Sequence, residues 1–152
     1  MMITLEISEA YRSRVDSSAL ETAVKTAIQQ QSAPADASLT LIISDDEQLH
    51  TLNRQYRNVD APTDVLSFSA DFIDPESNVP YLGDILISYE RATAQATSGG
   101  HSVADELLLL TVHGVLHLLE HDHATPEEKT RMWAAQNEIL RRLGAVSVIS
   151  EP

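Results

Sequence analysis

Residues 103–119 form a strongly apolar stretch, and this stretch restricts the fold more than any other feature of the 152-residue chain. Leucines and valines occupy nearly every direction around a helix drawn over these residues. A helix that is apolar all round is buried inside a protein. The sequence has no run of 18 uncharged apolar residues that would span a bilayer. We therefore expect a buried central helix with the rest of the chain packed around it.

Hydrophobic periodicity elsewhere predicts a mixture of strands and helices. Strands are expected over segments 2–8, 39–43, 65–68 and 81–88. Further helices are expected over segments 17–31, 45–56, 89–97 and 126–143. Segment 71–80, which contains two prolines and an asparagine, is expected to be a loop. This order of elements predicts an α+β fold: a single domain over 1–152, with a four-stranded mixed sheet and about five helices.

Small polar side chains mark the expected helix starts, because their oxygens accept hydrogen bonds from the first helical turn. A serine at position 17 or 18 is expected to cap the first helix. Ser44 is expected to cap the second helix, with Glu47 completing a capping box. Ser102 and Thr125 are the N-caps expected for the central helix and the last helix.

Charge and cysteine content limit the chemistry of the chain. It contains no cysteine, so a bound transition metal must use histidine, carboxylate or water. A formal net charge of −13 repels polyanions at long range, which argues against a nonspecific nucleic-acid binder but leaves room for a local basic patch. The N-terminus lacks a secretory pattern. We expect a cytoplasmic protein that does not contact a membrane.

Four of the six histidines lie in the segment HGVLHLLEHDH, residues 113–123. His113 and His117 are four residues apart, so both project from one face of the central helix with Cβ atoms about 5–6 Å apart. Two imidazoles in this arrangement can bind one ion at about 2.0–2.1 Å, the zinc–nitrogen distance. His123 follows the expected helix end, where the chain turns back. The spacing predicts a three-histidine site whose fourth position is open to water.

Other interpretations of this segment remain open. His121 is a competing third ligand, or the fourth ligand of a closed structural zinc site, and Asp122 is a candidate for orienting an imidazole. The histidines would otherwise be inert, hydrogen-bonded side chains. Two unpartnered imidazoles on a leucine-lined helix would each cost about 1–3 kcal/mol, which favours a metal. Zinc peptidases place glutamate directly after the first histidine, whereas this chain has Gly114, which argues against peptide hydrolysis.

Three motifs resemble the YbeY family of bacterial metal-dependent endoribonucleases, also described as ribosomal RNA maturation factors. The resemblance covers most of the chain. Its motifs are LNRQYRNVDAPTDVLSF (52–68), GDILIS (83–88) and the histidine segment (113–123). The chain departs from the family pattern at Glu120, where glycine is usual, and at Ser69, where proline is frequent. A left-handed backbone at Glu120 would cost on the order of 1–2 kcal/mol.

The resemblance implies a site and an activity. It implies one zinc-type ion held by His113, His117 and His123, and a functional role for Arg57. It also implies cleavage of single-stranded RNA, maturation of the 3′ end of small-subunit ribosomal RNA, and ribosome quality control. A guanidinium such as that of Arg57 can hold phosphate oxygens bidentately. From the residues alone, an ion pair of Arg57 with Asp60 or Asp64 is the alternative role.

Three functions follow from these observations. The first is a metal-dependent endoribonuclease that acts on single-stranded or ribosomal RNA. The second is a ribosome-assembly module with a mainly structural metal and ribosomal proteins or assembly GTPases as partners, which the acidic composition favours. The third, a metallopeptidase-like hydrolase, is weakened by Gly114.

Overall fold

The structure is a computed structural model that describes residues 1–150, without the side chain of residue 71. The final two residues of the expected domain, 151–152, lie outside the described part. The described elements, in chain order, are β1 (Met2–Ile7), η1 (Glu9–Arg14), α1 (Ser17–Gln30), β2 (Ser38–Ser44), α2 (Asp46–Arg57), β3 (Val65–Ile73), β4 (Pro80–Ser88), α3 (Tyr89–Gly99), α4 (Val103–Leu118), α5 (Pro126–Arg142) and η2 (Val146–Val148). The elements η1 and η2 are short 3₁₀ helices that the periodicity did not predict.

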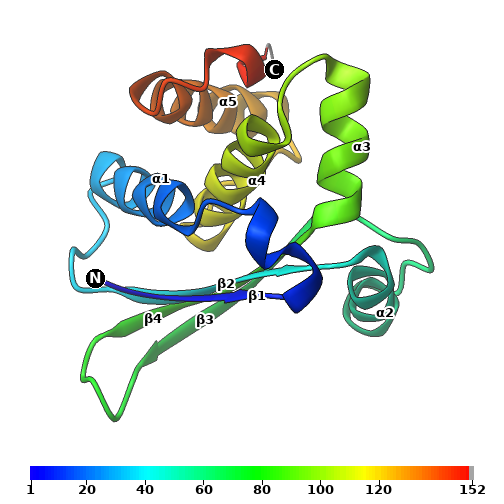
Figure 1. The fold of residues 1–152 in the computed structure, drawn as a ribbon. Helices are drawn as coiled ribbons and strands as arrows, with labels where there is room; N and C mark the ends of the chain where they lie inside the picture. The colour runs from blue at the N-terminus through cyan, green and yellow to red at the C-terminus, as the bar shows by residue number, and fades with distance from the viewer. Residues whose placement is uncertain (151–152) are drawn as a thin grey trace.

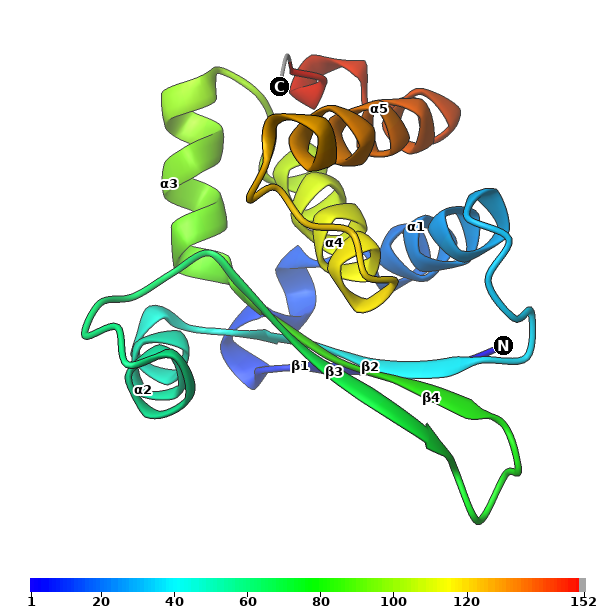
Figure 2. The same cartoon turned by 180° about the vertical axis from the view of Figure 1, so that it is seen from behind.

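The four strands form one mixed sheet in the order β1-β2-β4-β3. β1 pairs with β2 and β2 pairs with β4 in parallel, whereas β3 pairs with β4 in antiparallel orientation. Helices α1 and α4 lie over one face of the sheet, and α5 lies on the far side of α4 (Figure 1). Viewed from behind, α2 lies apart from these helices at one end of the sheet (Figure 2). The predicted α+β class and mixed four-stranded sheet are confirmed.

Helix α4 is the buried centre of the molecule, as its composition predicted. Its buried apolar side chains are Leu107, Leu110, Val112, Val115, Leu116 and Leu118. They belong to one core with side chains of β2 and β4, which include Leu41 and Ile85. A smaller cluster of Leu49, Leu66 and Leu86 joins α2 to β3 and β4. Among the described residues, no helix combines the length and the apolar character needed to cross a membrane.

Two of the expected N-caps are wrong by one or two residues. Asp16 caps α1, and its side chain accepts a hydrogen bond from the Ala19 backbone N–H. Asp45 caps α2 in the same way, whereas the Ser44 side chain bonds to that of Gln48. Aspartate and serine are comparable N-caps, so local preference did not distinguish neighbouring candidates. Ser102 and Thr125 do cap α4 and α5, as expected.

The expected loop over 71–80 is shorter than predicted: β3 continues to Ile73 and β4 begins at Pro80, so only 74–79 form the loop. Pairing resumes beyond an irregularity between Ser69 and Phe72, and the ring of Phe72 stacks on Tyr81 across the two strands. Pro80 is the first residue of β4, a position where a strand tolerates proline. Cross-strand pairing thus extends this hairpin through residues whose sequence indicates a loop.

Candidate metal centre

The end of α4 brings the third histidine back toward the first two. Glu120 has a φ of +72°, in the left-handed region. The Glu120 N–H donates to the His117 carbonyl, and the His121 N–H donates to the Leu116 carbonyl. These two bonds form a Schellman motif, which ends a helix and reverses the chain. Glycine is the usual residue at such a left-handed position. Glu120, which replaces the glycine of the YbeY pattern, therefore has a strained backbone.

The three predicted histidines converge at this turn. His113 and His117 project from α4, and their Nε2 atoms lie 3.1 Å apart. One ring nitrogen each from His113, His117 and His123 lies within 4.8 Å of the other two. Two nitrogen ligands of a tetrahedral zinc ion, each bonded at about 2.0–2.1 Å, lie about 3.3 Å apart. The spacing of the first two histidines therefore fits a shared ion, and His123 lies close enough to be a third ligand.

The protonation of these histidines also suits a metal. Burial, followed by repulsion from His113 and His123, lowers the pKa of His117 to about 4. Burial is likewise the largest cause that lowers the pKa of His113. Both imidazoles are therefore neutral at pH 7, and each has a lone pair free to bind an ion. The donor set and its protonation fit a divalent transition metal.

His121 and Asp122, the alternative site residues, take other roles. A ring nitrogen of His121 lies 2.7 Å from the side-chain oxygen of Gln31, the C-cap of α1, and His121 is not part of the histidine group. Asp122 accepts a hydrogen bond from the backbone N–H of His123 at 2.7 Å. It orients the turn rather than an imidazole. In the described residues the group thus has three members, which leaves a fourth coordination position for water or substrate.

Arg57 faces the same cavity as the three histidines. This cavity has a volume of about 460 Å³ and is lined by Arg57, Thr63, Asp64, Val65, Leu66, Ser67, Ser69, His113, His117, Asp122 and His123. Arg57 is the last residue of α2. Among the described residues, its guanidinium has one hydrogen-bond partner, the Asn53 side chain at 3.4 Å. The cavity therefore combines a potential metal site with an exposed guanidinium.

The expected alternative, an ion pair of Arg57 with Asp60 or Asp64, is not formed. Asp60 instead lies 2.7 Å from His50. Asp64 accepts hydrogen bonds from the Val65 backbone N–H at 2.8 Å and from the Gln95 amide at 3.3 Å. The guanidinium of Arg57 is consequently available to an anion in the cavity.

Gly114 faces away from this cavity and toward the sheet. A Cβ atom at position 114 would lie 2.6 Å from Ile85 Cγ2. The peptidase arrangement needs a glutamate here that reaches the metal. In this fold the position is pressed against β4, so it has no room for that side chain.

Two further residues complete the surroundings of the histidines. The Gln136 side-chain oxygen lies 2.9 Å from His113 Nδ1, and Gln136 is only 2% exposed. The ring of Trp133 meets those of His113 and His123 edge-on, at 6.0 Å between centroids. Both residues come from α5 and were not predicted. Gln136 shares the buried face of α5 with Met132 and Ile139. A polar residue at this otherwise apolar spacing is the sequence feature that could have pointed to Gln136.

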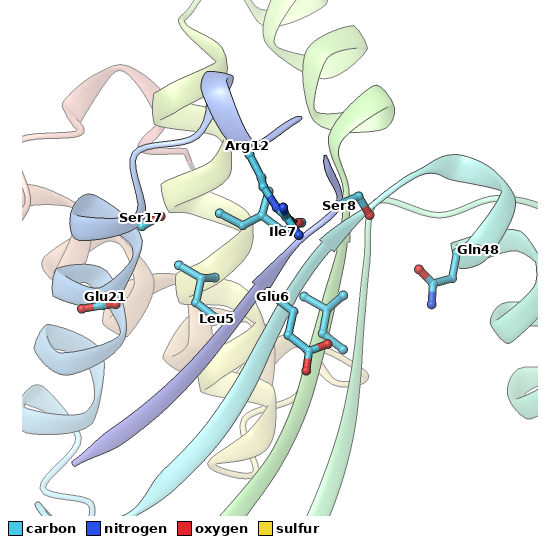
Figure 3. A pocket seen from close by; sticks show the side chains of 9 residues that line it. Leu5, Glu6, Ile7, Ser8, Arg12, Ser17, Glu21 and Gln48 are labelled. Atoms are coloured by element: carbon cyan, nitrogen blue, oxygen red, sulfur yellow. Dashed lines mark hydrogen bonds between the residues drawn. The ribbon is translucent and has the colours of Figure 1, made fainter. Parts of the chain in front are cut away.

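A separate cavity of about 840 Å³ lies beside the edge strand β1. Figure 3 shows Arg12 next to Ile7 at this place, and Glu6 of β1 and Glu21 of α1 also line the cavity. The Arg12 guanidinium donates to the Ile7 backbone carbonyl at 3.1 Å, and so occupies part of the free strand edge. No histidine lines this cavity. The three histidines that could hold a metal ion and the exposed Arg57 therefore single out the cavity at α4.

Comparison with known families identifies the fold around this site. A family model described as Endoribonuclease YbeY matches residues 5–144, a range that includes Arg57 and all three histidines. The chain belongs to the YbeY family. The resemblance seen in the three sequence motifs is thereby confirmed over most of the chain.

Relatives in this family align over nearly their whole length. An Endoribonuclease YbeY from Roseiflexus sp. (strain RS-1) is 45% identical over 148 residues, which cover 93% of this chain and 92% of the relative. One from Chloroflexus aurantiacus (strain ATCC 29366 / DSM 635 / J-10-fl) is 44% identical over 150 residues, which cover 95% and 97%. The solution structure of TM1509 from Thermotoga maritima covers 100% of this chain and 98% of its own, with a TM-score of 0.61 and 23% identity. That last similarity shows a shared fold alone.

Proposed function

We propose that this chain is a metal-dependent endoribonuclease that cleaves single-stranded RNA during ribosomal RNA processing. Its relatives are named endoribonucleases, and the family model spans residues 5–144. The main structural support is the shared cavity, where three convergent histidines lie with Arg57, which forms no ion pair among the described residues. We assign the activity to one catalytic domain over 1–152.

The proposed ion is zinc, one per chain, bound by His113, His117 and His123. All three ligands offer imidazole nitrogens, those of His113 and His117 are spaced as at a tetrahedral ion, and the chain has no thiolate. An ion of this type polarises a phosphoryl oxygen and lowers the pKa of water to about 7. These properties suit the hydrolysis of a phosphodiester at neutral pH.

Arg57 is the proposed phosphate-binding residue. Negative charge on the phosphate oxygens increases as a phosphodiester is cleaved, and a fixed guanidinium stabilises that charge. Arg57 is held at the C-terminal end of α2, where Asn58 ends the helix in a left-handed conformation. Ser69 also lines the cavity, and its hydroxyl is a further hydrogen-bond donor for a phosphate.

The proposed biological role is maturation of the 3′ end of small-subunit ribosomal RNA and ribosome quality control, in the cytoplasm. A net charge of −13 disfavours binding to bulk RNA and favours basic protein partners. We therefore infer that ribosomal proteins or assembly GTPases bring the enzyme to its RNA. This arrangement would separate recruitment, which uses the acidic surface, from cleavage, which uses the local charge of the cavity.

The test is cleavage of an end-labelled single-stranded RNA by the zinc-loaded protein. Arg57→Ala and His117→Ala are purified identically, so that contaminating nuclease is detected, and circular dichroism verifies their fold. Cleavage by the wild type and its loss in both folded variants supports the proposal. Equal cleavage by all three proteins, or none by any, contradicts it and favours the assembly module with a structural metal.

The ends of the products distinguish two routes of cleavage. Attack by water leaves a linear phosphate, whereas attack by the ribose 2′-hydroxyl leaves a 2′,3′-cyclic phosphate. Mass spectrometry of the fragments separates these outcomes. A cyclic phosphate would rule out direct attack by water.

A further inference from the structure

Gln136 is a buried polar residue on a helix face that is otherwise apolar. It lies on α5 with Met132, Ile139 and Leu140, all of them fully buried. Burying an amide costs free energy unless the amide is hydrogen-bonded. Its side-chain oxygen lies 2.9 Å from Nδ1 of His113. Among the described residues, this is the one hydrogen bond between a side chain of α5 and a histidine of the group.

The direction of this bond determines which nitrogen of His113 is free. A neutral imidazole has one N–H and one lone pair, and either nitrogen can hold the proton. An amide oxygen can only accept, so a bond to it requires the proton on Nδ1. The lone pair is then on Nε2, the atom that lies 3.1 Å from Nε2 of His117.

We propose that Gln136 is a positioning residue that holds His113 in the Nδ1–H tautomer and directs its Nε2 into the metal site. The proposal rests on the proposed metal site. Residues that hydrogen-bond to a metal-bound histidine in this way fix its ring and typically change metal affinity about 10–100-fold. Gln136 would perform this role from a rigid helix whose start is fixed by the Thr125 cap.

The choice of glutamine also fits an anionic substrate. A carboxylate at this position would hold the same tautomer, but it would add one negative charge beside the ion. That charge would oppose the approach of a phosphodiester and the stabilisation of its transition state. A neutral amide orients His113 without this cost. Gln136 thus adapts the site to an anionic substrate rather than to metal affinity alone.

The test compares Gln136→Met, which has a similar length but no acceptor, with Gln136→Glu, which keeps an acceptor and adds charge. Asn137→Met is the matched control, because Asn137 lies on the same helix and bonds to Ser150 rather than to a histidine. Two readouts are independent of activity. One is zinc affinity, measured by competition with a chromophoric chelator. The other is the ¹⁵N spectrum of the His113 ring in metal-free protein, which reports the tautomer.

We expect Nδ1–H in the wild type, a mixture of tautomers in Gln136→Met, and about a 10–100-fold weaker zinc affinity in that variant. Gln136→Glu should keep the tautomer and the affinity but cleave RNA at least tenfold more slowly. Asn137→Met should match the wild type in both readouts.

An Nε2–H tautomer in the wild type overturns the proposal, and this result needs no variant to fold. Wild-type zinc affinity in folded Gln136→Met also overturns it. If the wild type binds zinc with the expected tautomer but does not cleave RNA, the proposed nuclease function fails while the role of Gln136 stands.

Discussion

Gly114 of α4 packs directly on Ile85 of β4, and a Cβ atom at position 114 would lie 2.6 Å from Ile85 Cγ2. The Ser67 hydroxyl, on β3, donates to the Gly114 carbonyl at 3.2 Å. This close approach sets the height of α4 above the sheet. It thereby sets the position of His113 and His117 relative to the cavity wall formed by β3.

Gly114→Ala should therefore destabilise the protein. The added methyl group overpacks the interface between α4 and β4, which typically costs about 1–3 kcal/mol. Urea unfolding followed by circular dichroism measures the loss. The double variant with Ile85→Ala should lose less than the sum of the two single variants, because removing the Ile85 side chain relieves the clash. Additive losses would mean that this contact does not limit the approach of α4.

Replacing Arg57 should affect cleavage without affecting metal binding. Arg57→Ala removes the guanidinium from the cavity, and a loss of about 100-fold or more in kcat is expected. Arg57→Lys should recover only part of this loss, because an ammonium cannot hold phosphate bidentately. Zinc affinity, measured in parallel, should equal that of the wild type. An unchanged kcat for Arg57→Ala would exclude its proposed role.

Glu120→Gly should stabilise the protein, since Glu120 has a φ of +72°. A left-handed residue with a side chain costs about 1–2 kcal/mol, and the entropy of glycine offsets part of the gain, which leaves about 1 kcal/mol. Asn78→Gly is a suitable control, because Asn78 also has a positive φ but asparagine tolerates it better. Thermal unfolding should show a larger gain in stability for Glu120→Gly than for Asn78→Gly. The reverse order would contradict backbone strain at Glu120.

Acid should destabilise the metal-free protein through His117. Its pKa is lowered from 6.5 to about 4 by burial in the folded state. Between these values the unfolded chain binds more protons than the folded chain, so the free energy of unfolding decreases as pH falls from about 6.5 to 4. The contribution of this group is fully present above pH 6.5. Urea unfolding of the chelator-treated protein at several pH values measures the slope, and His117→Asn should flatten it. Identical slopes would exclude His117 as the source.

The sequence predicted local features of the fold better than long-range ones. The buried helix α4 and the caps Ser102 and Thr125 follow from periodicity and first-turn chemistry, which depend on neighbouring residues alone. The extension of β3 to Ile73 depends on pairing across the hairpin with β4, where Phe72 stacks on Tyr81. The residue types of this segment, with two prolines and an asparagine, do not reveal that pairing.

The residues of the candidate site were likewise predicted where local spacing is sufficient and missed where tertiary packing is needed. His113 and His117 were predicted because helical spacing alone places them on one face. The return of His123 required the helix to end, which the Thr125 cap indicated in advance. Gln136 was missed because it reaches His113 only through the packing of α5 on α4. The family motifs pointed to Arg57, but only the structure places it in the same cavity as the histidines.

The most direct test of the metal centre is a zinc titration that compares His117→Ala with His121→Ala. Both variants remove one histidine from the same short segment, yet His121 lies outside the group of three and bonds to Gln31. The wild type and His121→Ala should each bind one zinc ion per chain, whereas folded His117→Ala should bind at least 100-fold more weakly. Equal zinc binding by both variants would contradict the three-histidine site.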